Sequence, residues 1–168
     1  MAGDGKSGLR AQIEQTLHGR VCLMGVGNPE YGDDAFGVRL AEELVAAGVP
    51  DVIVAGSSPD RWVGFAADIG FDHLVFLDAV ELGAAPGSAV FLDCQEIAAR
   101  YPQISTHKIS LGVLAKVVES NTITKAWLLG VQPESMKEGQ DLTPTVLRTM
   151  GVLRELLLDL RTQLVNGS

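Results

Sequence analysis

The chain of 168 residues is long enough for one domain, and a domain of this size buries roughly two thirds of the surface that its unfolded chain exposes. Hydrophobic residues make up 46% and charged residues 20%, which is ordinary for a globular protein and excludes a disordered or fibrous chain. The 13 basic and 21 acidic residues give a net charge of −8 without a cluster of Lys or Arg, which excludes nucleic acid and anionic membrane surfaces as partners.

The apolar runs are short and broken by Asp, Gly or Asn, so we expect no membrane insertion. The first twenty residues lack the uninterrupted apolar core of a secretory signal, and we therefore predict a cytoplasmic protein. Cys22 lies inside an apolar run, and Cys94 has no CxxC partner. This pattern favours two buried or half-buried thiols over a disulfide or a metal site.

Residues 1–19 are expected to form a tail with a short helix in which Leu9, Ile13 and Leu17 share one side, and residues 20–168 to form one α/β domain. Nearly continuous apolar runs predict strands that are covered on both faces. A shorter run follows a Pro-Gly turn and is expected to be an edge strand, for which antiparallel pairing is one alternative. In chain order the predicted strands are Val21 to Val26, Val52 to Gly56, Leu74 to Ala79, Ala89 to Leu92 (the edge strand) and Ala126 to Val131.

Helical patterns lie between these strands. The first predicted helix ends at Gly48 and Pro50, and its apolar face consists of Val38, Ala41, Leu44 and Val45. The second is capped by Ser105 or Thr106, and its apolar face consists of Ile109, Val113, Val117 and Leu114. The third runs from Thr143 and has Pro144 in its first turn. This alternation predicts an α/β fold, a single-domain three-layer sandwich with a mainly parallel, twisted sheet of about five strands and helices on both faces.

Ligands of such sheets bind beyond the carboxyl ends of the strands. Asp33 and Asp34 follow the first strand, Asp78 ends the third, and His107 is expected to open the helix before the last. Each has an ordinary structural alternative: a helix cap for Asp33 or Asp34, an Asx turn for Asp78 and a solvated first-turn position for His107. Two adjacent acids, however, cannot cap the same helix end. Two carboxylates with a neutral imidazole suit nickel, zinc or manganese, so the pattern predicts a metal-binding or two-carboxylate cleft.

Four motifs in this order, GVGNPEYGDDAFGVRLAEEL, LDAVELG, STHKISL and LLGVQPES, resemble those of the nickel-iron hydrogenase maturation proteases. The GVQPES stretch is similar to the branch that processes the formate hydrogenlyase type of large subunit. The resemblance implies a monomeric endopeptidase that removes the C-terminal extension of a hydrogenase large-subunit precursor after nickel insertion. It also implies that the nickel arrives in the precursor, although other divalent ions would fit the same ligands.

The resemblance assigns the nickel-contacting positions to Asp34, Asp78 and His107 and the catalytic role to the two acids. Asp33 is then expected to cap and brace the helix start. Residues expected to support the turn or to contact the substrate are Gly27, Asn28, Gly32, Asp33, Gly56 and Ser57.

The chain departs from the family at two places. Many members have Glu where this chain has the shorter Asp34. An Asp-Gly-Gly-Thr or Asp-Gly-Gly-Ser stretch usually follows the second strand, whereas this chain reads Val54, Ala55, Gly56, Ser57 and Ser58. If the missing acid positions the precursor tail in other members, substrate selection here differs, through Ser57, Ser58 or Asp60.

Two hydrolytic schemes are open. In the first, a metal activates water and polarises the scissile carbonyl, and a carboxylate is the general base. In the second, Asp34 and Asp78 act as a carboxylate pair around one water. Other classes fit less well. A dinucleotide site lacks its third glycine, which is Glu30, and a serine hydrolase lacks its G-x-S-x-G elbow. A cysteine peptidase using Cys94 and His107, and a chaperone that binds nickel or the precursor without cutting, stay as alternatives.

Ordinary structural positions are expected for two tryptophans and for one further acid. Trp62 and Trp127 are expected in the core or in the wall of the cleft. Glu81 lies near enough to Asp78 in the sequence to replace it as a ligand, although a solvated loop acid is the simpler reading.

Overall fold

The computed structural model describes residues 4–100 and 110–166. Its strands coincide with the predicted apolar runs to within one residue at each end. In chain order the elements are α1 (Asp4–Thr16), β1 (Val21–Val26), the 3-10 helix η1 (Gly32–Ala35), α2 (Phe36–Ala46), β2 (Val52–Gly56), α3 (Asp60–Ile69), β3 (His73–Ala79), β4 (Ala89–Asp93), α4 (Cys94–Arg100), α5 (Leu111–Asn121), β5 (Lys125–Val131) and α6 (Pro144–Asn166).

The sheet has five strands in the order β2-β1-β3-β5-β4. The pairs β1–β2, β1–β3 and β3–β5 are parallel, which agrees with the apolar runs that predicted strands covered on both faces. The short strand β4 pairs antiparallel with β5 at one edge, as the Pro-Gly turn before it suggested. Strand β2 forms the other edge.

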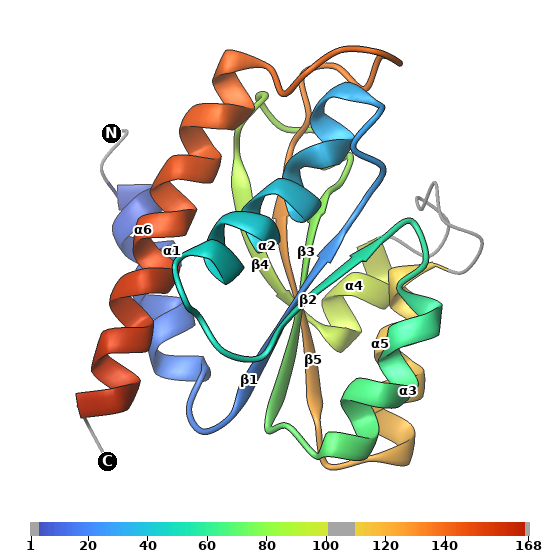
Figure 1. The fold of residues 1–168 in the computed structure, drawn as a ribbon, viewed down its shortest axis with the longest axis vertical. Helices are drawn as coiled ribbons and strands as arrows, with labels where there is room; N and C mark the ends of the chain where they lie inside the picture. The colour runs from blue at the N-terminus through green and yellow to red at the C-terminus, as the bar shows by residue number, and fades with distance from the viewer. Residues whose placement is uncertain (1–3, 101–109, 167–168) are drawn as a thin grey trace.

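Helices cover both faces of the sheet, which confirms the predicted three-layer α/β sandwich. In Figure 1 α1, α2 and α6 lie on one side of the sheet and α3, α4 and α5 on the other. The first layer packs on a core that includes Phe36, Leu40 and Leu44, and the second on a core around Phe76 and Leu128. Each such fully buried side chain stabilises the fold by about 1.5–3 kcal/mol.

Helix α1 joins the first of these cores, where Ile13 is 0% and Leu17 4% exposed. Helix α6 covers the same layer along most of its length and starts at Pro144, in agreement with the prediction. Among the described helices, none is both long and apolar enough to cross a bilayer.

Helix α5 differs from its prediction in start and in orientation. It starts at Leu111, and its cap is Ser110, whose hydroxyl accepts the Val113 N–H at 3.2 Å. The predicted caps Ser105 and Thr106, and the predicted apolar residue Ile109, lie outside the described residues. Val113 and Val117 are about half exposed, whereas the buried side consists of Leu111, Leu114, Ala115 and Val118. The helix is therefore rotated relative to the predicted face.

Helices α3 and α4 were not predicted. On α3 the apolar side chains Trp62, Phe65 and Ile69 are exposed, so the sequence does not separate a buried face from a solvated one. Helix α4 has seven residues, which is too short for a clear period. One smaller expectation was also wrong, because Val45 on α2 is 50% exposed. Trp62, expected in the core or in the wall of the cleft, is 41% exposed and is therefore not in the core.

Candidate active site

The candidate site lies at the carboxyl edge of the parallel strands. Strand β1 ends at Val26, and the chain then turns into η1, which contains Asp33 and Asp34. Strand β3 carries Asp78 next to its last residue, in register with Gly130 of β5. Because η1 packs against β3, both predicted carboxylate positions belong to one edge of the sheet, as the strand-end argument requires.

Two glycines allow the backbone to come this close. At Gly37, in the first turn of α2, a β-carbon would clash with the carbonyl oxygens of Leu77 and Val26, at the ends of β3 and β1. At Gly27 the φ angle is +135°, and a β-carbon would clash with the carbonyl oxygen of Asp34. Side chains at these positions would push the acid-bearing segment away from the strand ends.

Asp34 is 5% exposed and faces the turn that follows β1. Its Oδ2 accepts the backbone N–H of Asn28 at 2.9 Å. The side chain of Asn28 in turn accepts the Glu30 N–H at 2.9 Å, which is an Asx turn. Asn28 thus shapes the turn and its backbone orients the carboxylate, and this gives a physical basis to its predicted supporting role.

Asp33 points elsewhere, and its predicted role as the cap of the following helix is wrong. It is 0% exposed, and neither Tyr31 before η1 nor Ala35 before α2 caps with its side chain. The carboxylate instead accepts backbone N–H groups from Glu134 at 2.8 Å, Ser135 at 3.0 Å and Thr143 at 2.7 Å. The Thr143 hydroxyl lies 3.0 Å from both carboxylate oxygens. Asp33 therefore holds the segment between β5 and α6 against η1.

Asp78 is 3% exposed. The loop that follows it is held by Gln132, whose Oε1 accepts the Leu82 N–H at 2.7 Å and whose Nε2 donates to Glu81 at 3.0 Å. Glu81 itself is exposed, which favours the solvated loop acid over the replacement ligand. Sequence reasoning did not select Gln132 as a site residue, although it lies in the GVQPES stretch and is 5% exposed. The available signal was an amide directly after a predicted strand.

Other predicted supporting residues lie around the same turn. The N–H of Gly27 donates to the carbonyl of Gly56 at 2.9 Å, which joins the ends of β1 and β2. Gly32 donates to the carbonyl of Gln140 at 3.1 Å, in the segment that Asp33 also holds. Ser57 is exposed just beyond β2. These contacts bring the turn after β1, the end of β2 and the segment before α6 together.

His107 lies outside the described residues, so its predicted place as third ligand stays a prediction. Within residues 4–100 and 110–166, no group of three or more His, Cys, Asp and Glu side chains is arranged to hold a metal ion. The chemistry of Asp34 and Asp78 suits a divalent ion, because carboxylate oxygens are hard ligands. Keeping carboxylates this deeply buried is costly in free energy unless hydrogen bonds, a counterion or a metal compensates them.

Cys94 is a poor nucleophile in this fold. It is buried against the core on the α4 side of the sheet, and burial raises the pKa of its thiol. Burial likewise raises the pKa of Cys22 to about 12. Since the thiolate is the reactive form, these environments argue against the cysteine-peptidase alternative.

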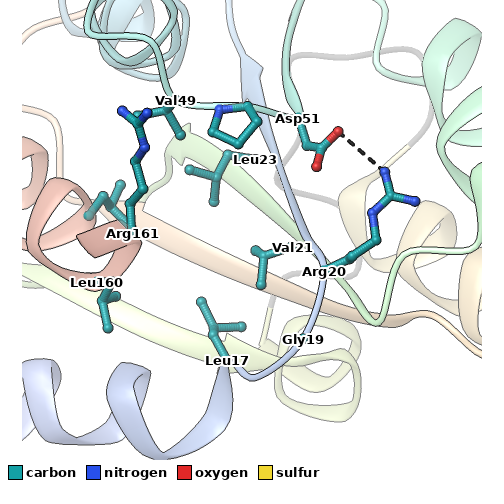
Figure 2. Close-up of a pocket in the computed structure, with 11 residues that line it drawn as sticks. Leu17, Gly19, Arg20, Val21, Leu23, Val49, Asp51, Leu160 and Arg161 are labelled. Carbon is teal, nitrogen blue, oxygen red and sulfur yellow. Dashed lines mark hydrogen bonds and ion pairs between the residues drawn. The ribbon is translucent and has the colours of Figure 1, made fainter. Parts of the chain in front are cut away.

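An apolar cavity of about 200 Å³ lies at the other end of the sheet. Figure 2 shows Leu17, Val21 and Leu160 around it, with the Arg20–Asp51 ion pair at 3.5 Å on its rim. Because these residues lie at or before the starts of β1 and β2 or near the end of α6, the cavity is remote from Asp34 and Asp78. The site is therefore assigned from the carboxylates and not from the cavity.

Comparison with known proteins identifies the family of this chain. The HycI family model, described as hydrogenase maturation protease, matches residues 38–160. The chain is 33% identical over 138 residues to the hydrogenase 2 maturation protease of Escherichia coli K12, which covers 76% of this chain and 81% of that protein. It is 32% identical over 114 residues to the hydrogenase 3 maturation protease of the same strain, covering 67% of this chain and 72% of that protein.

Solved structures of hydrogenase maturation proteases also resemble this chain. The crystal structure of the [NiFe] hydrogenase maturation protease HycI from Thermococcus kodakarensis KOD1 superposes with a TM-score of 0.79. It is 29% identical in sequence and covers 90% of this chain and 99% of that one. The sequence relatives are named for hydrogenase 2 and for hydrogenase 3, while the matching family model and the Thermococcus kodakarensis structure both carry the name HycI. By the extent of these matches, the chain belongs to the hydrogenase maturation protease family.

Proposed function

We propose that this protein is the endopeptidase that removes the C-terminal extension of a nickel-iron hydrogenase large-subunit precursor once nickel has been inserted. The observation that carries the proposal is the pair of buried acids, Asp34 and Asp78, at the one sheet edge that Gly27 and Gly37 bring together. Membership of the family supports the class of reaction. The nickel is part of the substrate, and Asp34, Asp78 and His107 recognise it there.

The proposed reaction is the hydrolysis of one amide bond. A carboxylate of the site accepts a proton from water as the water oxygen adds to the scissile carbonyl carbon. The same proton then passes to the amide nitrogen as the C–N bond breaks, leaving a new carboxylic acid on the subunit and a free amine on the released extension. The nickel in the precursor supplies positive charge that attracts the carboxylate oxygens of Asp34 and Asp78.

The two acids have different surroundings, which bears on their roles. Asp34 is held by the Asn28 N–H in a turn beside the ends of β1 and β2. Asp78 is fixed on the strand itself, next to a loop that Gln132 restrains. Both are placed on rigid backbone, as a preorganised hydrolytic site needs. Either acid can serve as the general base, and both are required in each of the two schemes.

Mass spectrometry of the organism's own large-subunit precursor tests the proposal. The precursor is incubated with this protein after nickel loading and, as the matched control, without nickel. Loss of the extension from the nickel-loaded sample alone is the expected result, and the Asp34→Asn, Asp78→Asn double variant leaves the precursor intact. If that double variant still trims the precursor, both hydrolytic schemes are wrong.

A non-cutting maturation chaperone is the second candidate, and the Val54–Ala55 departure from the family's acidic stretch favours it. The same incubation separates the two functions. A chaperone forms a stable complex with the nickel-loaded precursor and leaves its mass unchanged, whereas the protease releases a shortened subunit.

A further inference from the structure

Strand β2 forms an edge of the sheet, and its outward backbone groups have no neighbouring strand within the described part of the chain. Leu23 pairs in register with Val52, and the Leu23 N–H donates to the Asp51 carbonyl. In a parallel ladder this register turns the N–H groups of Ile53 and Ala55 toward β1. The N–H and C=O groups of Val52 and Val54 therefore point outward, away from the sheet.

The sequence of β2 does not protect this edge. Natural edge strands usually have a charge, a proline or a bulge that prevents pairing with another chain. Strand β2 reads VIVAG, without a charge or a proline, its register with β1 shifts only between Val54 and Gly56 at its end, and its Val54 is 39% exposed. Such a strand suits one kind of partner above others, namely an extended peptide that adds as a further strand.

Apolar side chains flank this edge on both faces of the sheet. On α3, Trp62, Phe65 and Ile69 recur on one side of the helix with exposures of 41%, 55% and 38%, and the Trp62 and Phe65 rings meet edge to face at 6.4 Å. Because the buried residues of α3, Val63 and Ala66, face the sheet and α5 packs beside α3 on one side, the exposed apolar side of α3 lies toward the β2 edge. The same reasoning places the half-exposed Val45 of α2 at this edge on the opposite face.

The edge also leads to the candidate site. Strand β2 ends at Gly56, whose carbonyl accepts the Gly27 N–H at 2.9 Å. Gly27 in turn packs against the backbone of Asp34. A peptide paired along β2 would therefore run directly to the turn that holds this carboxylate.

We propose that β2 accepts an extended segment of the large-subunit precursor, adjoining the cleavage point, as an additional strand of the sheet. The outward N–H and C=O groups of Val52 and Val54 bind its backbone. Trp62, Phe65 and Ile69 on one face, and Val45 and Val54 on the other, contact its alternating side chains. This inference rests on the proposed function and names the surface by which that site selects its substrate.

Replacing Val54 by proline and by threonine isolates the backbone contribution. Val54→Pro removes the outward N–H, and proline is tolerated at an edge-strand position whose N–H faces solvent. Val54→Thr keeps the N–H and the branched shape and serves as the matched control. With nickel-loaded precursor as substrate, we expect Val54→Pro to raise KM about fivefold with kcat unchanged, as for the loss of one hydrogen bond. Val54→Thr is expected to stay within about twofold of the unchanged protein's KM.

A second pair tests the apolar flank without altering the strand. Trp62→Ser is expected to raise KM at least about tenfold, because exposed aromatic anchors dominate binding surfaces. Val113→Ser on α5, which is 50% exposed and lies on neither β2 nor α3, is the control and leaves KM unchanged. The second pair also keeps the test decisive if Val54→Pro does not fold.

The inference is overturned if Val54→Pro folds and Val54→Pro and Trp62→Ser both process the precursor with unaltered KM. It is also overturned if these substitutions change only the oligomeric state in light scattering, because the edge then binds a second copy of the chain. Failure of the proposed function looks different, since the unchanged protein would then leave nickel-loaded precursor uncut. Binding of the precursor to the Asp78→Asn variant, with and without Val54→Pro, still measures the role of the edge in that case.

Discussion

Replacing Asp33 gives the sharpest test of how this fold holds its site together. The side chain is fully buried and accepts three backbone N–H groups and one hydroxyl from residues 134–143, all at 2.7–3.0 Å. Asp33→Ala leaves three partly buried N–H donors without their acceptor, and each such donor costs about 1–3 kcal/mol where water cannot replace the acceptor. Glu134 is exposed, so water reaches part of the segment after the substitution. We therefore expect the free energy of unfolding to fall by about 4 kcal/mol.

Asp33→Asn retains one acceptor oxygen and should cost less. If the amide oxygen faces Glu134 and Ser135, the amide nitrogen meets the Thr143 N–H, and two donors then oppose each other. One lost hydrogen bond and the loss of charge give an expected cost of about 2 kcal/mol. The two substitutions thus form a graded series set by the number of acceptors lost.

Urea unfolding followed by circular dichroism measures both values. With a slope of about 2 kcal/mol per molar, Asp33→Ala shifts the midpoint by about 2 M and Asp33→Asn by about 1 M. Asp68→Asn, an exposed acid on α3, is the control and shifts the free energy by less than about 0.5 kcal/mol. A cost below about 1 kcal/mol for Asp33→Ala would show that other contacts hold residues 134–143, and the assigned role of Asp33 would be wrong.

Three further outcomes follow from single residues. Gly27→Ala should cost more than about 3 kcal/mol in urea unfolding because of its positive φ and its contact with the next turn, whereas Gly64→Ala, with open space around it on α3, should be neutral or stabilising. Cys94→Ser should retain full processing activity, and Ellman's reagent should label the native thiol slowly at pH 8, since burial raises its pKa. Burial lowers the pKa of His73 below 6.5, and its Nδ1 accepts the Trp127 indole N–H at 3.0 Å. The unfolded chain therefore takes up the proton first, so the unfolding midpoint should fall as the pH drops from about 7 to 5, and His73→Gln should reduce this dependence.

Those features of the fold that depend on local pattern were predictable. Uninterrupted apolar runs locate the parallel strands because both of their faces are covered, and the Pro-Gly turn before β4 announces an antiparallel edge. The long apolar period after Pro144 locates α6 for the same reason. The positions of Asp34 and Asp78 followed from one general rule about the carboxyl ends of strands.

The features that escaped prediction depend on contacts between distant parts of the chain. The partners of Asp33 lie about a hundred residues further on, and nothing in the local sequence distinguishes such a tether from a helix cap. The rotation of α5 follows from which side meets α4 and the sheet, since Val113 and Val117 are as apolar as the side chains that are buried. Helix α3 was hidden by exposed aromatic residues, and these belong to the surface that we assign to the precursor.

The geometry of η1 gives its two adjacent acids different partners. Consecutive side chains of a 3-10 helix point about 120° apart, so Asp33 and Asp34 cannot serve the same partner. One direction leads to residues 134–143 and the other to the turn after β1. Because the tether and the candidate ligand are neighbours on one short, rigid helix, holding Asp33 fixes the backbone from which Asp34 projects. The first acid thereby preorganises the second, and an exchange of their roles would require η1 to rotate by a third of a turn against β3.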